Sequence, residues 1–314
     1  VLMQTACASA QNSASNSPVS EKRKVVFIAG PRSHGYGAHE HNAGSLLLSK
    51  LLTESHPGIE TVVHQNGWPP DPAALDDADA VVIFSNGGMS NPARTHLPEL
   101  KKAMDRGAGL VLLHYAVEIP ADSGGTEFLE WAGGHFAINW SVNPIWMMQA
   151  NPFPNHPVAR GLKQYEINDE WYYHMRFREG MRGITPILSA LPPASSLSRP
   201  DGLHSGNPHV RAAVLERKEP QHLAWAAERA NGGRGFGFTG AHFHWNWGHP
   251  MQGRLVLNGI AWAAHADVPA GGIPLRAVTM EELEANQDDP KSNRFDRAMW
   301  VGLIEGWHRE FGVR

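Results

Sequence analysis

The sequence predicts an α/β fold, a three-layer sandwich around a mostly parallel central sheet. Short apolar runs rich in β-branched residues recur along the chain, and helical stretches separate them. Continuous apolar strands are typical of parallel sheets buried on both faces, and alternation with helices places helices on both sides of the sheet. With 314 residues, of which 42% are hydrophobic and 18% charged, the chain is long enough for one large domain with extensions.

The first half of the chain shows this alternation. Residues 24–30 (KVVFIAG) predict a buried strand, and the leucines at 46–52 predict a helix after a glycine-rich loop. A turn and short helix separate the next two expected strands, and a glycine break at 107–109 ends a longer helix. These later elements are strands at 58–64, 78–85 and 110–113 and a helix at 92–106.

The second half begins with a short helix within residues 126–136. Residues 138–165 are rich in Trp, Pro and Asn, and we expect a strand and loops that form one wall of a site. Asn231-Gly232-Gly233 is a strong hairpin signal between two apolar runs. The expected elements are strands at 183–190, 211–218, 222–229 and 234–243 and a closing helix at 251–265.

Three segments are expected. Residues 1–23 contain Ala8-Ser9-Ala10, a small-residue pattern typical of signal cleavage, followed by a Ser/Asn-rich spacer. They are interpreted as an export-signal remnant and linker, which predicts a periplasmic or secreted protein. The alternative is a disordered N-terminal arm without a targeting function. Residues 24–267 form the α/β domain. Residues 268–314 form a helical extension, with a capping box at 279–282 and an apolar stripe that packs on the body or on a subunit partner.

Composition excludes several classes of function. The net charge of −4 and the lack of a Lys/Arg run argue against nucleic-acid binding. No apolar run is long enough to span a membrane. Cys7 is the only cysteine, so the domain has neither a disulfide nor a cysteine nucleophile. The 18 His suggest metal or proton chemistry, and the 11 Trp suit sugar-like ligands.

Histidines follow several predicted strands. The run at 234–243 leads into His242 and His244, which would lie side by side if the strand continued through them. His114 follows the strand at 110–113, where a strand-to-helix turn presents one side chain over the sheet. Ligands of open α/β sheets bind at the carboxyl ends of the strands. Each histidine taken alone is also consistent with a structural role.

Two further segments supply polar groups. The loop at 31–44 lacks the pattern of a phosphate loop and carries His34, His39 and Glu40 instead. Asp169 and Glu170 precede a run of aromatic residues and suit sugar binding or acid/base chemistry, or equally a solvated turn before an edge strand. On a strand, these adjacent carboxylates would face opposite ways.

The order of these motifs resembles the ThuA-like (trehalose utilisation) family over residues 24–265. The matching segments are the His/Gly loop after the first strand, LLHYA, GGHF, DEWYY, GAHFHWNW and LVLNGIAWA. The resemblance implies the flavodoxin-like fold of class I glutamine amidotransferases. His114 stands where those enzymes have a cysteine, and Asn246 stands where their catalytic carboxylate follows the histidine. Both departures imply that the protein is not a glutamine amidotransferase.

Imidazoles and a carboxylate that converge at a sheet edge suit a divalent metal such as Zn²⁺, Mn²⁺ or Fe²⁺. A metal there would polarise a carbonyl group or lower the pKa of water. The expected ligands are His39, His114 and His244, followed by His34, His242 and Glu170. The expected catalytic residues are His114, His244 and Glu170; without a metal, His114 and His244 would act as general base and acid. The expected substrate-binding residues are His34, Glu40, Tyr115, Trp171, His242, Trp245 and Asn246.

The resemblance also implies a carbohydrate substrate, in a setting with oxidoreductases that make 3-keto-glycosides. We therefore expect a carbohydrate-processing enzyme that removes a proton beside the keto group, as a lyase, hydrolase or isomerase. Hydrolysis of an unmodified glycoside needs two placed carboxylates, which adjacent Asp169 and Glu170 do not supply. The alternative is a non-catalytic carbohydrate-binding or accessory protein. A homo-oligomer or a sugar oxidoreductase partner, joined through the extension, is also expected.

Overall fold

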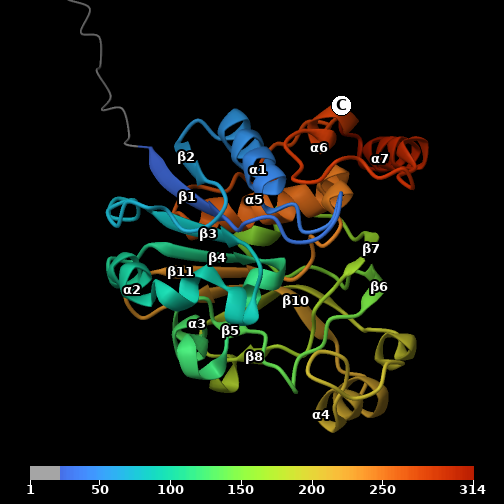
Figure 1. The fold of residues 1–314 in the computed structure, drawn as a ribbon, viewed down its shortest axis with the longest axis horizontal. Coiled ribbons are helices and arrows are strands. Elements are labelled where there is room, and N and C mark those ends of the chain that lie inside the picture. Colours follow the sequence, from blue (N-terminus) through green and yellow to red (C-terminus); the bar gives the residue numbers. More distant parts are fainter. Residues whose placement is uncertain (1–21) are drawn as a thin grey trace, which may run out of the picture.

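The computed structural model describes residues 22–314 and shows a seven-stranded sheet between two layers of helices (Figure 1). The strand order is β2-β1-β3-β4-β11-β10-β9, and only β10 runs antiparallel to its neighbours. This confirms the predicted α/β fold. The strands of this sheet are β1 (Arg23–Ala29), β2 (Ile59–His64), β3 (Ala80–Phe84), β4 (Gly109–Leu113), β9 (Ile184–Ala190), β10 (Gln221–Glu228) and β11 (Arg234–Phe238).

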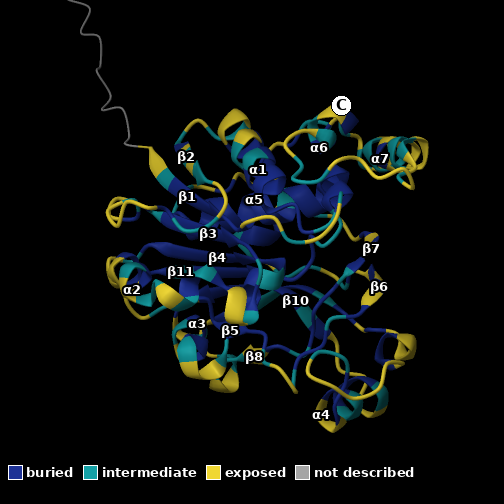
Figure 2. Ribbon diagram, in the orientation of Figure 1, coloured by how far each residue is buried: buried dark blue, intermediate teal, exposed yellow. Residues whose placement is uncertain are grey.

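Alternate residues of each central strand pack on opposite helical layers. Val25 and Phe27 of β1 face the layer that contains α1 and α5, whereas Val26 and Ile28 face α2 and α3. Both faces of the central sheet are therefore buried, which explains the uninterrupted apolar character of these strands (Figure 2). The helices are α1 (His41–Ser55), α2 (Leu97–Asp105), α3 (Gly125–Trp131), α4 (Pro208–Arg211), α5 (Pro250–Ala263), α6 (Met280–Glu284) and α7 (Arg297–Phe311).

Two small sheets flank the main one. β6 (Ile145–Gln149) and β7 (Glu166–Glu170) form an antiparallel pair, and β5 (Gly134–His135) pairs with β8 (Arg176–Phe177). The predicted wall between residues 138 and 165 is thus a strand whose partner, β7, carries Asp169 and Glu170.

The hairpin between β10 and β11 forms as predicted, but β11 is shorter than predicted. It ends at Phe238, and residues 239–243 form a loop before a short 3₁₀ helix at His244–Gly248. Ala241 has a positive φ of 87°, which is incompatible with a continuing strand. The prediction that His242 and His244 lie side by side on a strand is therefore wrong.

Two local predictions were also wrong. Residues 211–218 do not form a strand, since α4 continues into a π-helical turn at Ala212–Glu216. Asn207 caps this helix through the backbone N–H of Val210, with Pro208 at the first helical position, and Ala, Leu and Glu favour helix there. The prolines at 69, 70 and 72 likewise leave only turns where a short helix was expected before β3.

The C-terminal extension packs on the domain. Ile273, Leu283 and Ile304 belong to the same apolar cluster as α1 and α5. The capping box of α6 is present, with Thr279 and Glu282 exchanging side-chain-to-backbone hydrogen bonds. Among the described residues, no helix has the length and apolar character needed to cross a membrane. Cys7 and the expected signal remnant lie outside the described residues.

Candidate active site

Four side chains from separate segments meet at the carboxyl edge of the sheet. His39 lies in the loop between β1 and α1, His114 follows β4, Glu170 ends β7, and His242 lies in the loop after β11. One ligand atom of each lies within 4.8 Å of the others. We call these four residues the His/Glu cluster.

Two of these histidines have strained backbones. His39 and His114 have φ values of 50° and 54°, in the left-handed region that non-glycine residues rarely adopt. Such conformations persist only where the surrounding structure imposes them, and they concentrate at functional sites. For His114, the turn follows directly from the end of β4, so the side chain is presented over the sheet edge as the sequence predicted.

The ring nitrogens of the cluster point at one another. His39 Nε2 lies 2.9 Å from His242 Nδ1 and 3.1 Å from His114 Nε2. The Oε2 atom of Glu170 lies 3.1 Å from His242 Nδ1 and 3.5 Å from His114 Nε2. His34 stacks on the His39 ring at a centroid distance of 3.7 Å and covers this side of the cluster.

The hydrogen bonds outside the cluster determine one tautomer. His114 Nδ1 lies 2.8 Å from the carbonyl oxygen of Thr239, which can only accept a hydrogen bond, so Nδ1 carries the proton. In the neutral ring, Nε2 then presents a lone pair to the cluster. A carbonyl that orients an imidazole in this way is the usual outer partner of a metal-binding histidine.

Burial and charge determine the protonation states of two members. Burial, reinforced by nearby His114, lowers the pKa of His39 to about 2, so its imidazole is neutral. Burial alone would raise the pKa of the Glu170 carboxyl, but hydrogen bonds from the surrounding imidazoles hold that pKa below its usual range. Neutral imidazole and ionised carboxylate are the forms that bind a metal ion.

These residues fit a divalent metal. His39 Nε2 can form a hydrogen bond with only one of its two nitrogen neighbours at a time, so one of these two close contacts is left without a hydrogen bond. Five of the six donor separations run from 2.9 to 3.9 Å and bracket the spacing of about 3.3 Å expected for tetrahedral ligands about 2.05 Å from Zn²⁺. The three nitrogens and one oxygen suit Zn²⁺, Mn²⁺ or Fe²⁺.

Asp169 holds the loop that carries His242. The carboxylate is fully buried and accepts hydrogen bonds from the backbone N–H groups of Ala241, His242 and Phe243. Its Oδ2 atom also accepts from Asn246 Nδ2, 3.0 Å away. Adjacent Glu170 enters the cluster instead, so the two carboxylates face opposite ways, as expected for neighbours on a strand.

The cluster borders a polar cavity of about 330 Å³. His34, His39, Glu170 and Tyr115 line it, all of them predicted site residues. Four more lining residues were not predicted: Asn143, Tyr172, Arg199 and His204. The DEWYY motif contained Tyr172, but no local pattern marks the other three.

Two of the residues not predicted are held by carboxylates. The Tyr172 hydroxyl lies 3.3 Å from both Glu170 Oε2 and His114 Nε2, and burial raises the pKa of this phenol well above its usual value. His204 Nε2 lies 3.0 Å from Glu118 Oε2, and this hydrogen bond raises the pKa of His204.

His244 lies outside the cluster, which corrects its prediction as a ligand and catalytic residue. Its side chain is buried, and neither ring nitrogen has a hydrogen-bond partner among residues 22–314. The early end of β11 turns this residue into the start of the 3₁₀ helix. His242, which was expected to bind substrate or to rank lower as a ligand, occupies the position expected for His244.

Four other predicted substrate-binding residues support the structure around the site and do not line this cavity. Trp171 is fully buried and packs on Phe238, while Trp245 packs on Tyr36. Asn246 donates to Asp169. Glu40 accepts from the backbone N–H groups of Gly37 and Asp288, which ties the histidine loop to the C-terminal extension.

Comparison with known proteins identifies the family of the chain. The sequence profile described as "ThuA: Trehalose utilisation" matches residues 24–263, which is most of the chain. The chain belongs to the ThuA family. This confirms the resemblance found in the motifs, and the matched ThuA region contains all four cluster residues. It ends before α6 and α7, so the extension lies outside it. No curated protein matches the chain.

Solved structures of two ThuA-like proteins share the fold. A protein described as ThuA-like from Bacteroides uniformis has 17% identity and a TM-score of 0.54, covering 81% of this chain and 96% of its own. One from Parabacteroides merdae has 15% identity and a TM-score of 0.52, covering 84% and 99%. A protein described as a GMP synthase subunit from Thermoplasma acidophilum has 12% identity and a TM-score of 0.43, covering 78% and 95%.

Proposed function

We propose that this ThuA-family protein is a metal-assisted, carbohydrate-processing enzyme that acts on oxidised sugars such as 3-keto-glycosides. The observation that carries the proposal is the His/Glu cluster, with three imidazoles and one carboxylate converging beside a polar cavity. The family's association with trehalose utilisation supports a sugar substrate. Glutamine amidotransfer is excluded from the proposal because residues 22–314 contain no cysteine nucleophile.

His39, His114, His242 and Glu170 would hold the metal. When bound, such an ion polarises a substrate carbonyl group and so acidifies the neighbouring C–H bond. The ligands are then not free to transfer that proton, so another group in the cavity must do so. His204 is the best placed, because Glu118 orients Nε2 and leaves Nδ1 for a substrate proton.

The remaining lining residues would bind and orient the sugar. Asn143 and Arg199 offer amide and guanidinium donors to hydroxyl or carbonyl oxygens, and the Tyr115 ring forms part of the wall. A cavity of about 330 Å³ is at the small end of ligand pockets, which suits a single sugar ring. Loss of a proton beside the keto group would then allow elimination of the aglycone, or isomerisation.

The test is release of 4-nitrophenol from 4-nitrophenyl 3-keto-glucoside by untagged protein loaded with Zn²⁺, Mn²⁺ or Fe²⁺. We expect turnover that is lost in His114→Ala and falls about 10²–10⁴-fold in His204→Gln, with metal retained in the latter. Unmodified 4-nitrophenyl glucoside should remain intact. Metal binding without turnover, together with sugar affinity that survives both substitutions, would favour the carbohydrate-binding alternative.

A further inference from the structure

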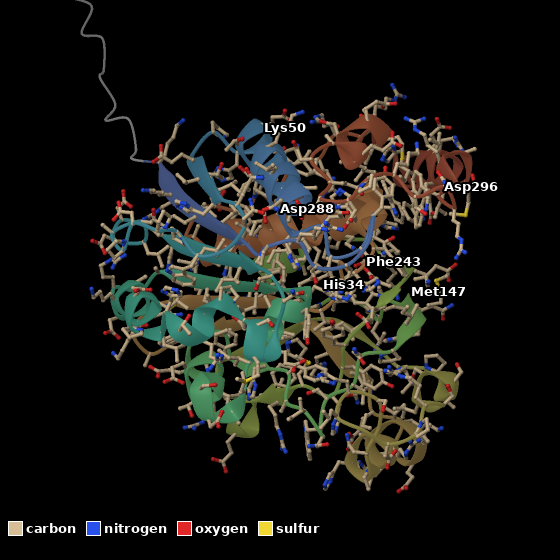
Figure 3. All side chains as sticks on the ribbon, viewed as in Figure 1. His34, Lys50, Met147, Phe243, Asp288 and Asp296 are labelled. Atoms are coloured by element: carbon tan, nitrogen blue, oxygen red, sulfur yellow. The ribbon has the colours of Figure 1, made fainter. Side chains whose placement is uncertain are left out.

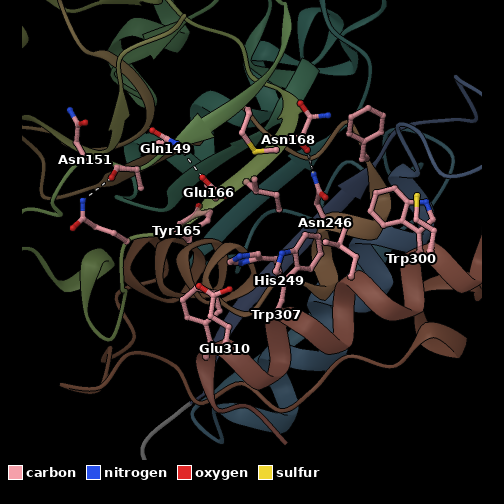
Figure 4. Close-up of a pocket in the computed structure, with 18 of the residues that line it drawn as sticks. Gln149, Asn151, Tyr165, Glu166, Asn168, Asn246, His249, Trp300, Trp307 and Glu310 are labelled. Atoms are coloured by element: carbon pink, nitrogen blue, oxygen red, sulfur yellow. Dashed lines mark hydrogen bonds between the residues drawn. The ribbon is translucent and has the colours of Figure 1, made fainter.

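A second cavity, of about 960 Å³, lies between the β6–β7 hairpin and α7 (Figure 4). One wall comes from the ThuA region, through β6, β7 and the segment after β11. The other wall is α7, which lies outside the matched residues. We call this cavity the α7 cleft.

The two walls differ in chemistry. On α7, Trp300, Trp307 and Phe311 present half-buried aromatic rings to the cleft. The opposite wall carries amide side chains among apolar residues such as Met147 and Leu191. The amide residues are Gln149, Asn151, Gln164, Asn168 and Asn246.

This combination suits a neutral saccharide. A pyranose ring has a face of C–H bonds that packs on the electron-rich face of an aromatic ring, and its hydroxyls pair with amide donors and acceptors. The charged residues that line the cleft are Glu166 and Glu310, and the lining contains no Lys or Arg within the described chain. An anionic ligand is therefore disfavoured.

Tyr165 is a buried member of the cleft lining. Its ring is held between His249, at 4.8 Å, and Phe153, at 6.5 Å. Its hydroxyl is enclosed by protein atoms, so Tyr165 contributes to the wall opposite α7 as a fixed aromatic residue.

The cleft adjoins the His/Glu cluster along one strand. Side chains at alternate positions of β7 share a face, so Glu166 and Asn168 line the cleft while Glu170 enters the cluster. These positions span about 13 Å of strand. The loop after β11 makes the same connection, because His242 lies in the cluster and Phe243 lines the cleft. In the view of Figure 3, Phe243 lies between Met147 of β6 and His34, which stacks on the cluster residue His39.

We propose that the α7 cleft binds the distal units of a neutral oligosaccharide or extended glycoside whose reacting sugar lies at the His/Glu cluster. This inference rests on the proposed function for its carbohydrate substrate. The C-terminal extension would then determine the preference for longer substrates, since α7 supplies the aromatic wall. The exposed rim formed by Met147, Met299 and Leu303 would contact the less polar edges of such a chain.

The experiment is titration of untagged protein with a panel of neutral tetrasaccharides (maltotetraose, cellotetraose and laminaritetraose), followed by tryptophan fluorescence and calorimetry. We expect at least one tetrasaccharide to bind about tenfold or more tightly than glucose. Trp307→Ala should weaken that binding at least about tenfold, as expected for an aromatic anchor. Trp68→Ala is the matched control, because Trp68 is half-buried and stacks on His96, away from the cleft.

The two proposals fail in different ways. Trp307→Ala should lose tetrasaccharide affinity yet take up as much metal as the parent, because Trp307 lies outside the His/Glu cluster. If no tetrasaccharide binds, or if Trp307→Ala binds as well as the parent, the cleft proposal is overturned whether or not metal is present. Self-association that Leu303→Glu abolishes, without carbohydrate binding, would overturn it in favour of a second copy on this face. If a tetrasaccharide binds through Trp307 but the protein takes up no metal, the cleft proposal stands and the metalloenzyme proposal is refuted.

Discussion

Replacing His242 and His244 separately by alanine tests which of the two is a ligand of the proposed metal. Zn²⁺ at about 100 times its Kd stabilises the folded parent by about 2.7 kcal/mol, which corresponds to a rise of about 5 °C in Tm for a chain of this size. Loss of one ligand weakens binding by at least about 100-fold, since even outer partners of a ligand cost 10–100-fold. The metal-dependent stabilisation of His242→Ala then falls to about 0.4 kcal/mol, or about 1 °C.

His244→Ala should behave differently. Its buried ring contacts no cluster member, so removal creates a cavity that lowers the stability of the metal-free protein by about 2–5 kcal/mol. The metal-dependent rise of about 5 °C should remain. The assay is differential scanning fluorimetry of each protein with EDTA and with Zn²⁺, beside metal content by mass spectrometry. Retention of the Zn²⁺ shift in His242→Ala and its loss in His244→Ala would refute the assignment of ligands.

Three further outcomes are expected. Asp169→Asn weakens the hydrogen bonds that hold the His242 loop, so metal affinity should fall about 10–100-fold in a metal titration; unchanged affinity would show that the loop needs no such support. Burial lowers the pKa of His249 to about 3, whereas the unfolded chain takes up that proton near pH 6.5, so acid favours unfolding. His249→Asn keeps a side-chain cap for the backbone N–H of Met251. Between pH 7.5 and pH 5, this variant should lose about 2 kcal/mol less unfolding free energy than the parent, measured by urea unfolding. An identical pH dependence in the two proteins would contradict this. Ile304→Ala should cost about 2–4 kcal/mol and leave metal content unchanged, because Ile304 anchors α7 against Gly248.

Local sequence predicted the strands that are buried on both faces. β1, β3 and β4 contain uninterrupted apolar runs that are followed by Gly30, Ser85 and His114, and each lies within about two residues of its expected bounds. Where apolar and helix-forming residues mix, as at 211–218, the same reasoning failed. There, the cap by Asn207 and the proline after it decided for helix.

For the site as well, local sequence signals predicted some residues and missed others. His39 and His114 directly follow strand and loop signals, so the sequence predicted them as ligands, and the structure places both in the His/Glu cluster. His242 and His244 follow the end of β11 by four and six residues, and the positive φ of Ala241, together with the hydrogen bonds that Asp169 accepts from this loop, decides which one faces the cluster. Glu118 and His204 are separated by 86 residues, and no local pattern links them.

The sequence by itself determined the α/β class, the order of the central elements and the family, because each depends on local apolar periodicity and on short motifs. It also determined that histidines gather at the carboxyl ends of the strands. The tertiary structure alone decided which four side chains converge, because convergence depends on loop conformations with positive φ and on the buried carboxylate of Asp169. It alone also placed α7 opposite β7, because that packing joins segments more than a hundred residues apart.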